Sequence, residues 1–137
     1  MYRLPLFQSG RVALCLCVVT LLAGCAPASV APTEPMALDG VTLSLESVPQ
    51  DTCDSNQPFA VKVSWEAIDW DVPKFDFRLG STEGQLWARH NTARGEQTSD
   101  AFGRPGMWFV MVDRESGLLV AVSQVPPLVC PETATPK

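Results

Sequence analysis

The sequence predicts an all-β fold, an antiparallel β-sandwich of about seven strands that follows a signal helix and a flexible linker. Several short segments alternate apolar and polar residues with a period of two, as half-buried strands do. Gly, Pro and Asp separate these segments and supply the turns between them. Beyond residue 24, no stretch has the 3.6-residue period of an amphipathic helix.

The signal helix is predicted from residues 1–24. Arg3 and Arg11 precede an apolar segment, 12–22, and small residues follow it, which is the three-part pattern of an exported chain. A membrane-spanning helix is the competing interpretation, but such a helix needs about 20 apolar residues. The apolar segment is shorter than that, so export is favoured.

The signal ends in Leu22, Ala23, Gly24 and Cys25. These residues resemble the lipobox of bacterial lipoproteins, which carry a type II signal peptide. In that family the cysteine is acylated, for instance with palmitate, and becomes the first residue of the mature protein. Two or more acyl chains hold a protein firmly, because each buried CH₂ contributes about 0.8 kcal/mol. The next residue is Ala26 and not aspartate, which in Gram-negative members of the family implies the outer membrane, with the domain facing the periplasm.

Three parts of the chain are predicted: the lipoprotein signal peptide 1–24, the acylated cysteine with a Pro/Ala-rich linker 25–40, and the β-sandwich domain 41–137. The linker contains three prolines and has no hydrophobic period. Extended as polyproline II, such a chain rises about 3.1 Å per residue. It is expected to hold the domain away from the bilayer.

The strands of the domain are predicted from its alternating segments. The segment 107–112 is apolar at every position, as in a strand covered on both faces. A polar loop, 113–117, follows it and suits a hairpin, and the pair Pro126–Pro127 ends the last strand, because proline cannot donate to a ladder. The predicted strands are 41–46, 59–65, 75–79, 86–90, 107–112 and 118–125.

The order of these strands resembles that of an immunoglobulin-like or fibronectin type III-like domain. The resemblance implies that Trp65 fills the core and that 106–109 opens a late central strand. The sequence departs from the family because its only tyrosine is Tyr2, so no tyrosine corner can form.

The chain contains five cysteines. Cys15 and Cys17 lie in the signal, and Cys25 takes the lipid. Cys53 and Cys130 remain as a pair in an exported chain, which predicts a disulfide between them. Two free thiols or a metal pair are the alternative, but partner ligands are missing nearby. The bond would clamp the first long loop of the domain to the C-terminal tail.

Enzymatic activity, a metal site and a cofactor are not expected. His90 is the only histidine, lies at a strand end and is expected to be solvated, and the chain has no nucleophile-elbow motif. The acidic segment 51–56 offers oxygen ligands but lacks the glycine and terminal glutamate of a calcium loop. A turn rich in Asp, Ser and Asn explains that segment equally well.

Nucleic-acid binding is excluded by charge. The whole chain has a formal net charge of −5, and the signal removes two of its basic residues and none of its acidic ones. An acidic mature chain repels phosphates.

Four residues are predicted to form a patch that contacts a protein partner, because tryptophan and arginine are the usual anchors of interfaces. Ordinary loop solubility is the alternative for the arginines. The candidates are Trp87, Arg89, Arg94 and Arg104.

The expected function is that of a lipid-anchored, non-catalytic binding or accessory module that has a protein partner in the cell envelope. The alternative is an inhibitor or immunity protein against a cell-wall hydrolase. An inhibitor of this kind inserts a protruding loop into a cleft, and the polar segment 92–106 is the candidate loop.

Overall fold

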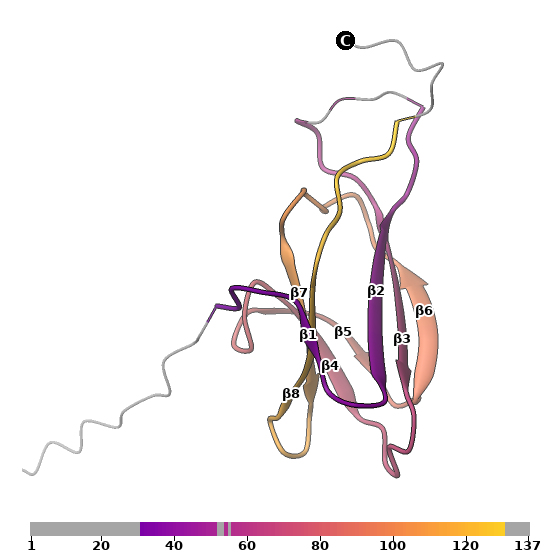
Figure 1. Ribbon diagram of the computed structural model, residues 1–137. Coiled ribbons are helices and arrows are strands. Elements are labelled where there is room, and N and C mark those ends of the chain that lie inside the picture. Colours follow the sequence, from indigo (N-terminus) through magenta and orange to yellow (C-terminus); the bar gives the residue numbers. More distant parts are fainter. Residues whose placement is uncertain (1–30, 52–53, 55, 131–137) are drawn as a thin grey trace, which may run out of the picture.

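The computed structural model describes residues 31–51, 54 and 56–130. These residues form an antiparallel β-sandwich of two sheets (Figure 1), which confirms the predicted fold class. The described part of the chain contains no helix, and therefore none that is long and apolar enough to cross a membrane. The signal peptide, the lipobox and Cys25 lie outside the described residues.

The larger sheet has five strands in the order β1-β8-β7-β4-β5, and the smaller has three in the order β2-β3-β6. The strands are β1 (Met36–Ala37), β2 (Val41–Ser47), β3 (Val61–Ala67), β4 (Phe75–Leu79), β5 (Gln85–His90), β6 (Arg94–Thr98), β7 (Trp108–Asp113) and β8 (Leu119–Gln124).

The three-stranded sheet is built around β3, which pairs with β2 on one side and β6 on the other. Val61, Val63 and Trp65 alternate with polar residues, and all three are buried. Successive residues of a strand point to opposite faces, so this alternation turns Lys62 and Glu66 to the outer face of the sheet.

In the five-stranded sheet, β4 and β7 are neighbouring inner strands, and their side chains contribute to the centre of the core. Phe75, Phe77 and Phe109 are fully buried between the two sheets. On the other face of β7, Val110 and Val112 form a second buried cluster with other apolar residues. The prediction that this strand is covered on both faces is confirmed, and the strand begins at Trp108.

The sandwich is closed along one side and open along the other. On the closed side, β2 packs against β8, and β1 contacts both of them (Figure 1). On the other side, β5 and β6 are the free edges of their sheets and do not pair with each other. Two twisted sheets that pack face to face cross at about 30°. The distance between the sheets therefore increases away from the side on which they are in contact. The separation leaves a lateral opening between β5 and β6.

The strand order agrees in part with that of an immunoglobulin constant domain. There, strands A, B and E face C, F and G, and here β2, β3 and β6 face β4, β7 and β8. The difference is β5, which pairs with β4, whereas the D strand of a constant domain joins A, B and E. Membership of that family stays a prediction.

Two strands were not predicted. The linker was expected to run to Gly40, but Met36–Ala37 pairs with β8, and the Leu38 amide donates to the Val120 carbonyl at 3.0 Å. The sheet therefore begins inside the predicted linker. A two-residue strand is too short to produce a periodic pattern.

The second unpredicted strand, β6, takes up five residues of the predicted protruding loop 92–106. Its inward positions carry Gly95 and Gln97, so the strand has no apolar alternation. Gly95 lies directly beneath Trp65, and a Cβ atom there would be 2.5 Å from Trp65 Cζ2. The glycine thus makes room for a core tryptophan.

The remaining loop between β6 and β7 is held against the sandwich. Phe59 and Gly103 exchange two backbone hydrogen bonds, of 3.0 and 2.8 Å. A Cβ at Gly103 would be 2.4 Å from Val61 Cγ2, so the loop approaches β3 closely.

Candidate binding cleft between the sheets

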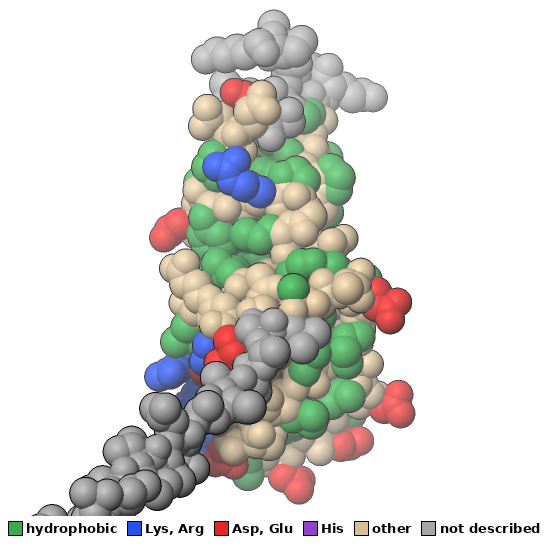
Figure 2. All heavy atoms as spheres, turned by 90° about the vertical axis from the view of Figure 1, so that its left-hand side faces the viewer, with side chains coloured by type: hydrophobic (Ala, Val, Ile, Leu, Met, Phe, Trp, Pro, Cys, Tyr) green, Lys and Arg blue, Asp and Glu red, His purple; other side chains and the backbone are tan. Residues whose placement is uncertain are grey.

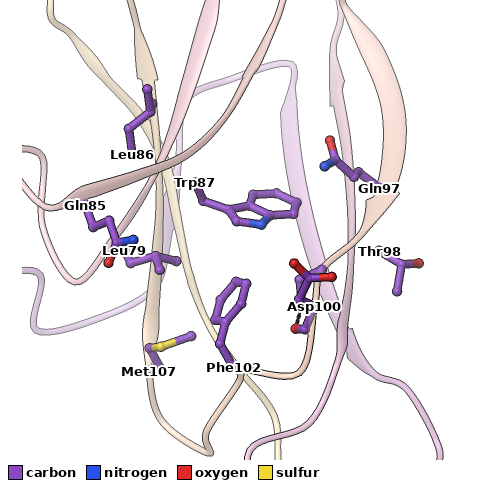
Figure 3. Close-up of a pocket in the computed structure, with 10 residues that line it drawn as sticks. Leu79, Gln85, Leu86, Trp87, Gln97, Thr98, Asp100, Phe102 and Met107 are labelled. Carbon is purple, nitrogen blue, oxygen red and sulfur yellow. Dashed lines mark hydrogen bonds between the residues drawn. The ribbon is translucent and has the colours of Figure 1, made fainter.

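A cleft of about 630 Å³ occupies the lateral opening between β5 and β6. Figure 3 shows its walls: β5 on one side, β6 on the other, and the loop after β6. The side chains that line it include Gln85, Trp87, Gln97, Asp100 and Phe102.

A β-bulge directs Trp87 into this cleft. On β4, Phe77 pairs with Ala88 and the next residue, Arg78, pairs with Leu86, so Trp87 is the extra residue of β5. A bulge of this kind disturbs the normal alternation and re-aims a side chain, often beside a functional site. In Figure 3 the indole of Trp87 extends across the cleft toward Gln97.

The ring of Trp87 is held in one orientation by its neighbours. Its centroid lies 5.3 Å from that of Phe109, 6.3 Å from that of Phe77 and 6.5 Å from that of Phe102, all at steep interplanar angles. Edge-to-face contacts of this kind stabilise aromatic pairs by about 0.5–1.5 kcal/mol beyond the area that they bury. The indole is therefore positioned before any ligand arrives.

The indole N–H of Trp87 is available to a ligand. By contrast, Trp65 Nε1 donates to the Thr92 carbonyl at 3.1 Å. No described residue accepts a hydrogen bond from Trp87 Nε1, and no buried side-chain nitrogen or oxygen in the described part lacks a partner. The N–H of Trp87 must therefore be exposed to solvent in the cleft.

His90 and Gln97 link β5 to β6 at one end of the cleft. The His90 ring contacts Trp65 with centroids 4.2 Å apart and an interplanar angle of 39°, and its Nε2 lies 2.8 Å from Gln97 Oε1. His90 is therefore partly solvated and partly covered, because the residue is half-buried and its ring contacts Trp65. With its oxygen engaged, Gln97 keeps its amide NH₂ group for a ligand.

The loop after β6 places a carboxylate at the rim. Ser99 is buried, and its Oγ accepts from the Val61 amide at 2.9 Å and donates to the Asp100 carbonyl at 2.8 Å. These bonds fix the start of the loop, while the Asp100 side chain is exposed and lines the cleft. Among the described lining residues there is no Lys, Arg or His.

The predicted partner patch of Trp87, Arg89, Arg94 and Arg104 is not brought together. Trp87 lies in the cleft, whereas Arg89 Nε is 3.2 Å from Asp76 Oδ1 on the outer face of the five-stranded sheet. Arg94 is 3.1 Å from Glu66 on the outer face of the other sheet. Arg104 lies in the loop between β6 and β7. The prediction of a single patch is wrong, because strand pairing places Trp87, Arg89 and Arg94 on three different surfaces of the sandwich.

Sequence reasoning missed a charged cluster around Asp76. This side chain is only 5% exposed, and Arg78, Arg89 and Arg114 approach its oxygens at 3.2, 3.2 and 2.9 Å. Burial of the Asp76 carboxyl opposes its ionisation, but the hydrogen bond from Arg114 and the charges of Arg89 and Arg114 outweigh it and lower the pKa. The cluster comes from β4, β5 and the turn after β7, so no local motif could have revealed it.

The surface around this cluster is mixed. Figure 2 views the molecule from the side of the five-stranded sheet. Hydrophobic side chains lie among polar ones along the face, and acidic side chains stand at its margin.

The predicted disulfide lies partly outside the described residues, because Cys53 is not among them. The neighbouring backbone is informative, since Ser47 Oγ donates to the Pro127 carbonyl at 3.1 Å and accepts from the Val129 amide at 3.2 Å. These bonds hold the C-terminal segment before Cys130 against the end of β2, where the loop that contains Cys53 begins. The disulfide stays a prediction.

In the described part of the chain, no group of three or more His, Cys, Asp or Glu side chains is arranged to hold a metal ion. Comparison with known proteins found no matching protein-family model, no matching curated protein and no matching solved structure.

Proposed function

We propose that this chain is a lipid-anchored lipoprotein of the cell envelope that acts as a non-catalytic binding or accessory module, and that the cleft between β5 and β6 is its binding site. The observation that carries the proposal is the bulge that turns Trp87 into the cleft and leaves its N–H exposed. A bulge weakens strand pairing locally, and the half-buried Trp87 gives up part of its burial. Both costs are explained if the Trp87 side chain binds a ligand.

The chemistry of the cleft suits binding. Its polar groups are two amides, hydroxyls and one carboxylate, placed beside aromatic rings. Ligand sites in proteins are typically concave and combine apolar walls with a few placed polar groups. Such groups orient a ligand by hydrogen bonds.

The position of the anchor fits this use of the cleft. The linker that would connect the acylated Cys25 to the domain joins the five-stranded sheet at β1, and β5 is the opposite edge of that sheet. Adjacent strands lie about 4.8 Å apart, so four strand spacings put the cleft roughly 19 Å from the point of attachment. The tether therefore leaves the opening clear.

The binding proposal is tested by capture from an envelope extract on the immobilised full-length chain. Trp87→Ala should lose a captured component that the unmodified chain retains. Trp108→Ala is the matched control, because Trp108 is also half-buried but lies on the outer face of the same sheet. Circular dichroism confirms that both variants fold. Equal capture by the Trp87→Ala variant would remove the cleft from consideration.

The inhibitor alternative has less support, because part of the segment 92–106 forms β6 and Gly103 in the same segment is tied to Phe59. Inhibition of wall hydrolases by the purified chain would reinstate it.

A further inference from the structure

We propose that the cleft binds a neutral saccharide, with one sugar ring stacked on the indole of Trp87. This inference rests on the proposed binding function and adds the chemical class of the ligand. Four properties of the cleft support a saccharide ligand: its size, its aromatic surface, its hydrogen-bonding groups and its charge.

The size of the cleft suits a ligand of one or two sugar rings. Its volume of about 630 Å³ falls within the range of about 300–1,000 Å³ that is typical of small-molecule sites. The cleft is open at the side of the sandwich, between two strand edges. A longer chain can therefore continue beyond the rings that are bound.

The aromatic surface matches the apolar side of a sugar ring. A pyranose presents C–H groups on its faces and hydroxyls around its rim. The face of an indole is the negative pole of its quadrupole and attracts such C–H groups. Trp87 is already fixed by Phe77, Phe102 and Phe109, so little side-chain entropy is lost when the ring stacks.

The hydrogen-bonding groups match the rim of a sugar. Hydroxyls both donate and accept, and amide side chains do the same. Gln85 lies on one wall and Gln97 on the other, Asp100 offers acceptors at the rim, and Trp87 Nε1 offers a donor (Figure 3). A purely apolar ligand would leave these groups without partners, at a cost for each group.

The charge of the cleft excludes anionic ligands. Asp100 is its one ionisable lining residue in the described part, and no lining cation balances it. An organic ammonium ion is the competing ligand class, because a carboxylate and a tryptophan also attract cations. Replacement of the carboxylate separates the two classes, since a cation needs the charge whereas a hydroxyl needs only an acceptor.

The test is calorimetric titration of the full-length chain in a polyoxyethylene detergent, which carries neither a sugar nor a choline group. The probes are N,N′-diacetylchitobiose, cellobiose and choline. We expect at least one disaccharide to bind, Trp87→Ala to weaken it by about tenfold or more, and Trp108→Ala to leave it unchanged. Asp100→Asn should retain binding within about threefold, because an amide oxygen still accepts a hydrogen bond.

Three results would overturn the inference: no binding of either disaccharide, equal binding by the Trp87→Ala variant, or binding of choline that Asp100→Asn abolishes. Loss of the saccharide class does not by itself end the binding function. If capture from envelope extract still depends on Trp87 while neither sugar binds, the cleft serves another ligand.

Discussion

Two tryptophans of this domain show how the same side chain takes different roles. Trp65 is 4% exposed, packs over Gly95 and has a backbone acceptor for its N–H. Trp87 is half-buried and has no described acceptor for its N–H. The expectation that Trp65 fills the core is confirmed. The free N–H of Trp87 could not be predicted, because it depends on side chains from other strands.

The contact between Gly95 and Trp65 gives the first prediction. Gly95→Ala places a methyl group against the rigid indole, so the free energy of unfolding should fall by about 1–3 kcal/mol. Urea denaturation measures this change. Glu96→Ala on the same strand is the control, because its surface ion pair with Lys62 contributes less than about 1 kcal/mol. Equal stability of the Gly95→Ala variant and the unmodified chain would show that the core accommodates the methyl group.

The second prediction concerns Asp76 and pH. The pKa of its carboxyl is lowered from 3.8 in the folded state. The stabilisation is therefore fully present above pH 3.8 and is lost as the pH falls through the folded-state pKa. Asp76→Asn should lower the free energy of unfolding at neutral pH by about 1.5–3 kcal/mol, because it removes the charge-assisted hydrogen bonds that the buried carboxylate accepts from partly exposed arginines.

The measurement is urea denaturation of both chains at several pH values from neutrality down into the acid range. The two stability curves should converge as Asp76 becomes protonated. Parallel curves would mean that the carboxyl does not stabilise the fold in its ionised form.

At the scale of elements, the sequence was informative where one face of a strand is apolar. The predicted segments 41–46 and 75–79 correspond to β2 and β4 almost residue for residue. β6 was missed because its inward residues are a glycine and a glutamine. The cleft was missed because it depends on the bulge in β5, and a bulge is a property of the pairing between two strands.

The third prediction concerns the clamp between the first long loop and the C-terminal segment. A Cys53–Cys130 disulfide would stabilise the domain by about 4 kcal/mol according to the chain-entropy model. Cys130→Ser should lower the free energy of unfolding by that amount, and a reductant should lower it equally in the unmodified chain. Denaturation with and without reductant, together with mass spectrometry of alkylated thiols, measures both effects. Alkylation of both cysteines in the unreduced, unfolded chain would show that the bond is absent.

At the scale of the whole molecule, the closed and open sides of the sandwich carry different features. The closed side holds β1, where the linker arrives, and the open side holds the cleft. The sequence predicted the export signal, the linker and the sandwich as separate parts. Only the folded arrangement shows that the attachment point and the cleft lie at opposite edges of one sheet.

This separation gives the fourth prediction. Cys25→Ser should release the protein from the membrane fraction and abolish incorporation of radiolabelled palmitate, because the acyl chains supply the membrane affinity. The released chain should still bind its ligand, since the cleft lies far from the tether. Unchanged membrane association of the Cys25→Ser variant, or an unlabelled parent chain, would contradict the lipid anchor.

The most direct test of the cleft is the resonance of the Trp87 indole N–H in a two-dimensional nitrogen–proton spectrum of the full-length chain. The chain has four tryptophans, and single substitutions assign their indole signals. During titration with solubilised fragments of the cell envelope, we expect the Trp87 signal and the backbone signals of 85–87 and 97–102 to shift first and most. Shifts confined to the outer faces of the sheets, with the Trp87 signal unmoved at saturation, would contradict this expectation.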